Sequence, residues 1–239
     1  MVPQPLPVAA SGPAGSDREP SYIKVRIRFR KAGALRLLSH HDLLRCFERM
    51  LRRAELRYRT TAGFNPKPRL VFASALPLGV VGCEEVVELE LDEERTPEDI
   101  QARLTRQAPA GLEFLAVKPI APRTTAHVAW VTYAVALPSD SPPSLLAAIA
   151  ALLASANGWV ERTRPEKRRI DVRPYLRTVR LLDQRLEMDL TVTPQGTARP
   201  DEVLELLGLR SLLDAGAVLE RTRLVLEDEV EPAGGTSCR

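Results

Sequence analysis

An alternation of apolar and basic side chains over residues 22–30 constrains the fold more than any other feature of the chain. Every second side chain is apolar, and the side chains between them are basic; the two sets are Ile23, Val25, Ile27 and Phe29, and Lys24, Arg26, Arg28 and Arg30. Successive side chains of a β-strand point to opposite faces, so the pattern predicts a strand with one buried and one polar face. Such a strand needs other elements to cover its apolar face.

A capped amphipathic helix is predicted over residues 42–54. Ser39 and Asp42 form an S-x-x-D pattern, a variant of the capping box that starts a helix. The 3.6-residue period gathers the apolar residues on one side of this helix; they are Leu43, Phe47, Met50, Leu51 and Ala54. The same period gathers a basic stripe on the opposite side, made of His41, Arg45, Arg49 and Arg52. We therefore expect one face to pack on the sheet and the other to meet solvent.

The order of the elements predicts the fold class. Strands are expected at 70–76, 85–92 and 112–117, and a second helix at 96–107, which gives strand–helix–strand–strand–helix–strand over the first half of the chain. This order is typical of the ferredoxin-like, or split βαβ, unit. A looser version of the same pattern follows, so we predict an α+β protein with two tandem ferredoxin-like units and antiparallel sheets. The expected divisions are a disordered tail at 1–20, units at 21–118 and 127–227, a linker at 119–126 and a disordered tail at 228–239.

The composition limits the compartment and the cofactors. No apolar run is long enough to span a membrane, and the first residues lack the basic and apolar regions of a signal peptide. Cys46, Cys83 and Cys238 are widely spaced, without a CxxC pair, which argues against a zinc site or an iron–sulfur cluster. We therefore expect a cytoplasmic protein with no metal and no cofactor, and no contact with a membrane.

The charges are unevenly distributed along the chain. Residues 22–80 contain 14 Lys and Arg against 3 Asp and Glu, whereas residues 81–120 contain 4 against 10. One interpretation is a basic surface for phosphates. The other is neutralisation between neighbouring strands, with Glu88 and Glu90 beside the cations of residues 22–30. The residues alone leave both interpretations open.

Two adjacent histidines are the candidate catalytic residues. His40 and His41 stand at the predicted start of the first helix, and histidine titrates near neutral pH, as general acid–base catalysis requires. The alternative is that His40 packs at the start of the helix, His41 is solvated and Asp42 serves only as a cap. No third ligand accompanies them, so a metal site is not expected.

A basic surface is the candidate binding site. It combines the helix arginines Arg45, Arg49, Arg52 and Arg53 with the loop residues Asn65, Lys67 and Arg69. Several arginines on one helix face suit successive phosphates, and Pro66 and Pro68 stiffen the loop. The alternatives are a solvated helix face and a loop that closes the core with Phe64 as its plug. We interpret the basic segment 166–173 as a solvated turn and Cys46 as a packed residue.

Several segments resemble the radical-SAM-linked protein family, a bacterial domain of unknown function. They are LSHHDLLRCFERMLRRAEL (37–55), GFNPKPRLVFASALPLG (63–79), the following EVVELEL, and more loosely RRIDVRPYL (168–176) and TARPDEVLELL (197–207). Thr60-Thr61-Ala62 and Gly82-Cys83 depart from the family pattern. The resemblance spans roughly residues 22–225.

The resemblance implies a protein that acts beside a radical S-adenosylmethionine (radical SAM) enzyme. The chain has no CxxxCxxC motif for the cluster of such an enzyme and no complete catalytic constellation, so we expect an accessory module rather than an enzyme. Together with the charge distribution, this favours a module that binds tRNA or rRNA and presents it to the partner. The alternatives are a metal-independent ribonuclease that uses His40 or His41, and a protein–protein adaptor for the radical SAM enzyme.

Overall fold

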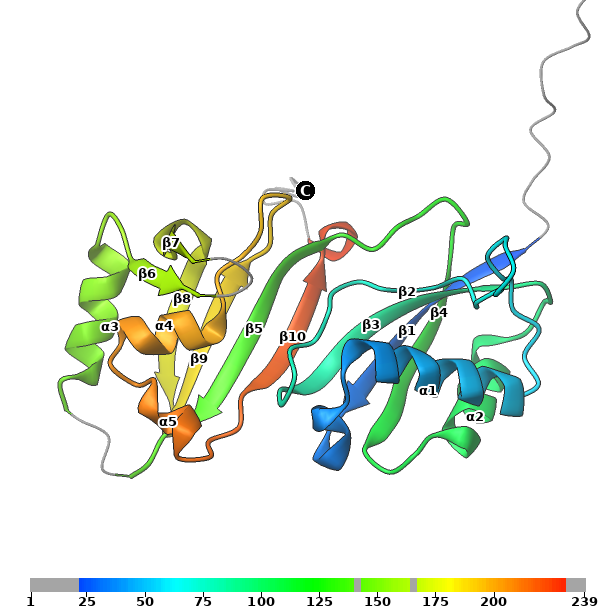
Figure 1. Cartoon of the computed structure of the whole chain (residues 1–239), viewed down its shortest axis with the longest axis horizontal. Helices are drawn as coiled ribbons and strands as arrows, with labels where there is room; N and C mark the ends of the chain where they lie inside the picture. Colours follow the sequence, from blue (N-terminus) through cyan, green and yellow to red (C-terminus); the bar gives the residue numbers. More distant parts are fainter. Residues whose placement is uncertain (1–21, 140–142, 164–166, 231–239) are drawn as a thin grey trace, which may run out of the picture.

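The protein contains one eight-stranded, mostly antiparallel sheet with few helices, which confirms the predicted α+β class. A computed structural model describes residues 22–139, 143–163 and 167–230 (Figure 1). The strands of the sheet are β1 (Ile23–Lys31), β2 (Leu70–Phe72), β3 (Val81–Leu91), β4 (Leu112–Ile120), β5 (Val128–Ala136), β8 (Leu176–Leu182), β9 (Arg185–Thr191) and β10 (Glu220–Leu226). Strands β6 (Trp159–Arg162) and β7 (Arg168–Asp171) form a separate hairpin.

The sheet repeats one strand order in the two halves of the chain. The order is β4-β1-β3-β2 in the first half and β10-β5-β9-β8 in the second, and all neighbours within each half are antiparallel. The last strand, β10, runs parallel to β3 through the pairs Glu220↔Val81 and Arg221↔Gly82. The two halves therefore share a single sheet, and the end of the chain lies in its middle (Figure 1).

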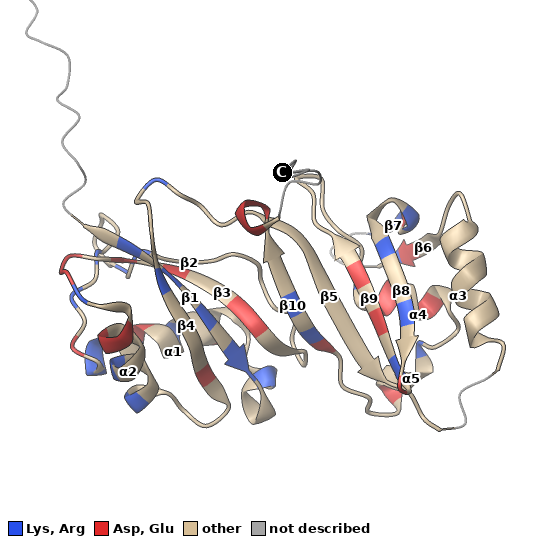
Figure 2. Cartoon of the chain, turned by 180° about the vertical axis from the view of Figure 1, so that it is seen from behind, with Lys and Arg blue, Asp and Glu red and all other residues tan. Residues whose placement is uncertain are grey.

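The helices cover one face of this sheet. They are α1 (His40–Arg53), α2 (Pro97–Gln107), α3 (Leu145–Ala154), α4 (Pro200–Leu206) and α5 (Ser211–Asp214). Helices α1 and α4 cross in front of the strands in Figure 1, and the strands lie in front of them when the molecule is turned by 180° in Figure 2. Two apolar cores result, one under α1 and α2 and one under α3 and α4.

The first predicted strand and helix form as their periodicity indicates. In β1, Val25, Ile27 and Phe29 are buried, and the register pairs Val25 with Leu89 and Ile27 with Val87. Helix α1 buries its predicted apolar face, and the Ser39 hydroxyl accepts a hydrogen bond from the backbone N–H of Asp42 at 3.2 Å. Local patterns sufficed here because each element has one face that must be removed from water.

The strand predicted over 70–76 stops at Phe72. After Ala73, the backbone leaves the sheet, and the carbonyl oxygens of Ser74 and Ala75 accept hydrogen bonds from the guanidinium of Arg221 at 3.4 and 3.3 Å. A long-range hydrogen bond thus replaces the strand pairing that the apolar run LVFASAL suggested. The prediction of a strand to residue 76 is wrong for this reason.

The boundaries between the predicted units also differ from expectation. Strand β4 continues to Ile120, two residues into the expected linker, because Val25 and Lys24 of β1 pair with Pro119 and Ile120. At the other end, residues 227–229 form a turn of 3-10 helix. The tails expected to be disordered at 1–20 and beyond residue 230 lie outside the described residues.

Candidate functional site

The exposed side of α1 carries cations with little neutralisation. We call Arg45, Arg49, Arg52 and Arg53 the α1 surface; all four are exposed. Arg45 lies 3.8 Å from Asp42, a long contact between two exposed groups. Within the described part of the chain, no carboxylate lies within ion-pair distance of the other three. Such groups are available to an external anion.

The thiol next to this surface is not a nucleophile. Cys46 is buried in the core, and burial raises the pKa of its thiol, although the neighbouring Arg49 and Arg53 lower that pKa in part. A raised pKa keeps the thiol protonated and unreactive. This confirms the prediction that Cys46 is a packed residue.

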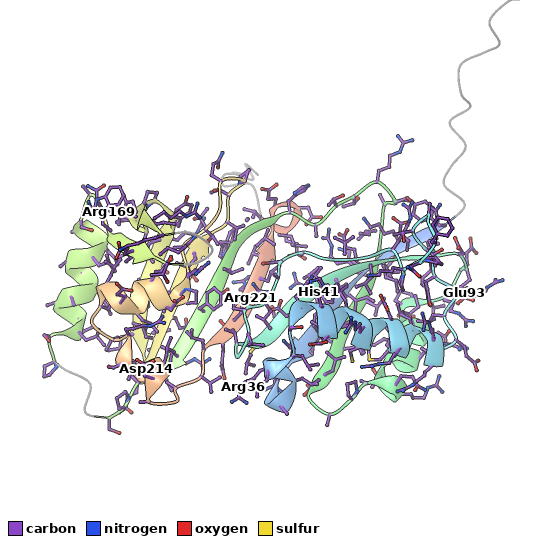
Figure 3. The ribbon with its side chains drawn as sticks, in the orientation of Figure 1. Arg36, His41, Glu93, Arg169, Asp214 and Arg221 are labelled. Carbon is purple, nitrogen blue, oxygen red and sulfur yellow. The ribbon has the colours of Figure 1, made fainter. Side chains whose placement is uncertain are left out.

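The two histidines lie at the exposed start of α1. The His40 ring contacts the edge of Phe72, with 5.3 Å between the ring centroids, and His41 is labelled on α1 in Figure 3. Their rings lie 6.2 Å apart. No described carboxylate orients either imidazole, so a catalytic role for His40 and His41 stays a prediction.

The loop of residues 60–69 is held by its own hydrogen bonds. The backbone N–H of Thr61 donates to the Lys67 carbonyl at 2.8 Å, the N–H of Lys67 donates to the Thr61 hydroxyl at 3.1 Å, and Thr60 pairs with Pro68. These bonds close the loop on itself at the edge of the sheet beside β2. The loop is therefore a built projection and does not cover the core.

The tip of this loop overturns one alternative for it. Phe64 is fully exposed, with a relative accessibility of 107%. A phenyl ring that served as a plug would be buried, so the interpretation of Phe64 as a plug of the core is wrong. Sequence reasoning missed the exposure because burial is the default for phenylalanine.

The predicted polar residues of the loop accompany the exposed ring. Asn65 and Lys67 are exposed. Arg69 is also exposed, and it lies 3.7 Å from Glu90, which Arg59 contacts as well at 3.5 Å. Glu90 thus neutralises loop cations rather than the cations of β1. Lys67 has no carboxylate within ion-pair distance among the described residues.

The cations of β1 are neutralised inside the sheet. Lys24 lies 2.8 Å from Glu88, and Arg26 lies 3.0 Å from the same carboxylate and 2.9 Å from Asp228. Figure 2 shows basic positions on β1 beside acidic positions on β3. The predicted cross-strand pairing with Glu88 is confirmed. Both interpretations of the charge distribution therefore hold, in different parts of the molecule.

A buried polar cluster joins the two halves of the sheet. We call Lys31, Glu85, Tyr133 and Arg221 the junction cluster. Arg221 is 2% exposed; its Nε donates to Glu85 at 2.8 Å, and its Nη2 makes a second bond to the same carboxylate. Burial alone lowers the pKa of Arg221, but Glu85 and Tyr133 outweigh it and raise the pKa. Arg221 is labelled between the halves in Figure 3, where it holds β10 against β3.

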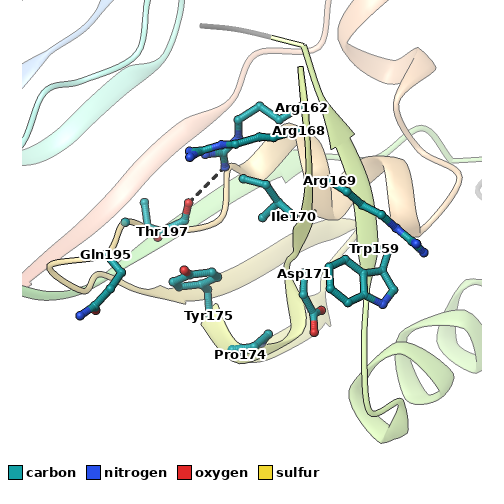
Figure 4. A pocket seen from close by; sticks show the side chains of 11 residues that line it. Trp159, Arg162, Arg168, Arg169, Ile170, Asp171, Pro174, Tyr175, Gln195 and Thr197 are labelled. Carbon is teal, nitrogen blue, oxygen red and sulfur yellow. Dashed lines mark hydrogen bonds between the residues drawn. The ribbon is translucent and has the colours of Figure 1, made fainter. Parts of the chain in front are cut away.

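A pocket in the second half was not predicted. It lies between the β6–β7 hairpin and the loop after β9 (Figure 4), and we call it the β6–β7 pocket. Its lining includes Trp159, Arg168, Arg169 and Tyr175. The basic segment that we interpreted as a solvated turn is therefore partly the wall of a cavity. Only the pairing of β6 with β7 brings these residues together, so no local pattern could have revealed it.

The described residues contain no helix that is long and apolar enough to cross a membrane. Among the same residues, no group of three or more His, Cys, Asp or Glu side chains is arranged to hold a metal ion.

Comparison with known proteins gives a family but no activity. No curated protein matches the chain. One solved structure that it resembles is titled as an unknown protein from Galdieria sulphuraria; the match has 11% identity and a TM-score of 0.27, and covers 86% of this chain and 98% of the other. A family model described as "Uncharacterized protein conserved in bacteria (DUF2344)" matches residues 24–200, a span that contains the α1 surface, the 60–69 loop and the β6–β7 pocket. The chain therefore belongs to this uncharacterized bacterial family.

Proposed function

We propose that the protein is an RNA-binding accessory module that contacts RNA through the α1 surface and the 60–69 loop. The observation that carries the proposal is the combination of arginines without partner carboxylates and a fully exposed phenyl ring on a closed loop. Exposed cations attract the phosphates, and an exposed aromatic ring stacks on unpaired bases. Both contacts are absent from a merely solvated helix face.

The spacing of the arginines fits a nucleic-acid backbone. A helix rises 1.5 Å per residue, so Arg45 and Arg49 are separated by about 6 Å along the axis, and Arg49 and Arg52 by about 4.5 Å. Long arginine side chains cover the remaining difference to successive phosphates of a single strand. Arginine also forms paired hydrogen bonds to phosphate oxygens. The helix therefore presents a row of phosphate ligands.

The architecture and the partner form the second part of the proposal. The repeated strand order supports two tandem ferredoxin-like units, each with its helices on one face of the sheet. The resemblance of 37–79, 168–176 and 197–207 to the radical-SAM-linked family supports a radical SAM enzyme as the partner. In this arrangement the chain holds tRNA or rRNA, and the partner performs the chemistry.

The RNA part is tested by affinity at two salt concentrations. We expect the wild-type protein to bind cellular tRNA and rRNA at low salt, and the variant Arg49→Glu with Arg52→Glu to lose most of this affinity. In the milder variant Arg49→Ala with Arg52→Ala, the slope of log K against log salt falls by about 1.4, or 0.7 for each lost phosphate contact. Wild-type protein that fails to bind at low salt would sink the proposal.

A matched control separates the site from the net charge. The variant Arg177→Glu with Arg223→Glu changes the net charge equally at two exposed positions of β8 and β10. It leaves the RNA affinity close to that of the wild type if the α1 surface is the site. Equal losses in the two double variants would show nonspecific attraction only.

The remaining alternatives give different results with the same protein. RNA cleavage that disappears in His40→Ala with His41→Ala supports the ribonuclease, and cleavage that persists in this variant excludes it. Co-purification with a radical SAM enzyme encoded nearby tests the partner. If the complex forms without RNA and the protein alone binds none, the adaptor is favoured over the RNA-binding module.

A further inference from the structure

We infer that the β6–β7 pocket binds a nucleotide, with the phosphate on Arg168 and Arg169 and the base against Trp159 and Tyr175. This site goes beyond the proposed function, because it lies in the other half of the molecule from the α1 surface. Arg169 and His41, which are both labelled in Figure 3, mark the two positions on opposite sides of the junction cluster. The inference rests on the shape, the charge and the aromatic lining of the pocket.

The pocket has the size of a small-ligand site. Its volume is about 350 Å³, within the range of roughly 300–1,000 Å³ that is usual for such sites. Its walls come from the β6–β7 hairpin, from Pro174 and Tyr175 after that hairpin, and from Gln195 to Thr197 after β9 (Figure 4). Segments from separate parts of the second half thus converge on one cavity.

The charges of the pocket leave two arginines for an anion. Arg162 is neutralised, because its guanidinium bonds to both carboxylate oxygens of Glu202 at 2.6 and 2.8 Å. Asp171 is occupied as well, since it accepts bonds from the backbone N–H groups of Gly158 at 2.7 Å and Arg173 at 3.1 Å. Arg168 and Arg169 are exposed, and no described carboxylate lies within ion-pair distance of either. The pocket therefore attracts a phosphate.

The aromatic residues add a second requirement for the ligand. Trp159 is 47% exposed, although tryptophan is usually well buried. The guanidinium of Arg169 lies 4.7 Å from the centre of the Trp159 ring, which positions this cation without neutralising it. Tyr175 lines the same cavity and is half-buried. Flat apolar rings beside unpaired guanidiniums match a ligand that has both a ring and a phosphate.

A nucleoside phosphate has this chemistry. Its base stacks on the aromatic rings, and the exposed amide of Gln195 is placed to hydrogen-bond with the edge of the base. Inorganic phosphate would leave the rings exposed, and a nucleoside would leave the arginines unpaired. The nucleotide comes either from a free mononucleotide or from an unpaired position of an RNA strand.

The experiment uses Trp159 as its own reporter. The chain contains two tryptophans, so Trp130→Phe leaves Trp159 as the only one. This variant is titrated separately with adenosine, guanosine, cytidine and uridine 5′-monophosphates, with the four nucleosides, with inorganic phosphate, and with a short 5′-phosphorylated single-stranded RNA. We expect a saturable change in fluorescence with at least one nucleotide or with the RNA, and weaker responses to the nucleosides and to phosphate.

Charge-removal variants decide the role of the arginines. In the same background, Arg168→Ala with Arg169→Ala lowers the nucleotide affinity about tenfold or more, because charge-assisted hydrogen bonds to the phosphate are lost. The control variant Arg177→Ala with Arg223→Ala leaves it unchanged. Saturation by a mononucleotide assigns the site to free nucleotides, whereas saturation by the RNA alone assigns it to a strand.

Two results would overturn the inference. One is the absence of a saturable response to every nucleotide and to the RNA. The other is an affinity that Arg168→Ala with Arg169→Ala does not reduce, or a nucleoside that binds as tightly as its monophosphate. Failure of the proposed RNA surface is a separate outcome, because Arg49→Glu with Arg52→Glu leaves the mononucleotide affinity unchanged.

Discussion

The α1 surface and the junction cluster use the same residue type in opposite ways. The arginines of α1 are exposed and, apart from the long contact of Arg45 with Asp42, have no described carboxylate within ion-pair distance. Arg221 of the junction cluster is 2% exposed and makes two hydrogen bonds to Glu85. A solvated cation costs little to leave unpaired, whereas a buried cation must be paired. Exposure therefore determines which arginines stabilise the fold and which are available to a ligand.

The comparison divides the basic sequence into two sets. The strand cations Lys24 and Arg26 behave like Arg221, since Glu88 neutralises both at 1% exposure of its own side chain. The cations of α1 do not, although they belong to the same basic stretch of the chain. Net charge alone would have assigned all of them to a ligand surface.

The largest expected effect is the loss of a buried ion pair. Replacement of Glu85 by alanine leaves Arg221 buried without its carboxylate, and we expect the free energy of unfolding to fall by about 3–5 kcal/mol. Urea titration followed by circular dichroism measures this change. The control is Glu113→Ala, which breaks the exposed pair with Arg30 at 3.1 Å and costs less than about 1 kcal/mol. Equal costs at the two sites would contradict the division by burial.

A methyl group at position 82 tests how firmly the pair is held. A Cβ atom there would lie 2.5 Å from Cγ and 2.7 Å from Oε1 of Glu85, which Arg221 holds in place. Gly82→Ala should therefore cost about 1–3 kcal/mol through overpacking. In the Glu85→Ala background the clash disappears, so the same substitution costs less. Additive costs in the double variant would show that the carboxylate moves freely.

The exposed ring gives the opposite result to the buried pair. Phe64→Ala removes no packing, because the side chain is fully exposed, and the unfolding midpoint stays unchanged. The same substitution should weaken binding to single-stranded RNA by about 1–3 kcal/mol through lost base stacking, as measured by fluorescence anisotropy. Binding to a fully paired duplex serves as the control, because its bases are not available. An equal loss for duplex RNA would remove the stacking role.

The smallest effect concerns the pH dependence of stability. Burial lowers the pKa of Lys31 below its ordinary value of 10.5; Glu85 raises it in part, and Arg221 lowers it further. Between the folded pKa and 10.5 the unfolded chain binds the proton more tightly, so Lys31 makes the free energy of unfolding rise with pH in that window. Outside the window its contribution does not change with pH.

The variant Lys31→Met isolates this contribution. The difference in unfolding free energy between the wild type and Lys31→Met, measured by urea titration at several values from about pH 8 to 11, should rise with pH in favour of the wild type. The loss of the Lys31 hydrogen bond to the Leu38 carbonyl, 2.9 Å long, adds an offset that does not depend on pH. A difference that falls with pH would contradict the assigned direction.

The sequence by itself determined the local elements and the exposed cations. The alternation in β1, the two faces of α1 and the Ser39 cap follow from periods of two and 3.6 residues, which lie within a few positions of each other. The α1 surface followed from the same period, because a helix that buries one face must expose the opposite one. These features need no knowledge of distant residues.

Only the tertiary structure decided which charges are neutralised and where the β6–β7 pocket lies. Glu85 and Arg221 are 136 positions apart, and they meet because β10 inserts between β3 and β5. The exposure of Phe64 and the convergence of Trp159, Arg169 and Tyr175 likewise depend on strand pairings that no short pattern encodes. The physical reason is that burial depends on every element packed around a residue, whereas periodicity depends only on its neighbours along the chain.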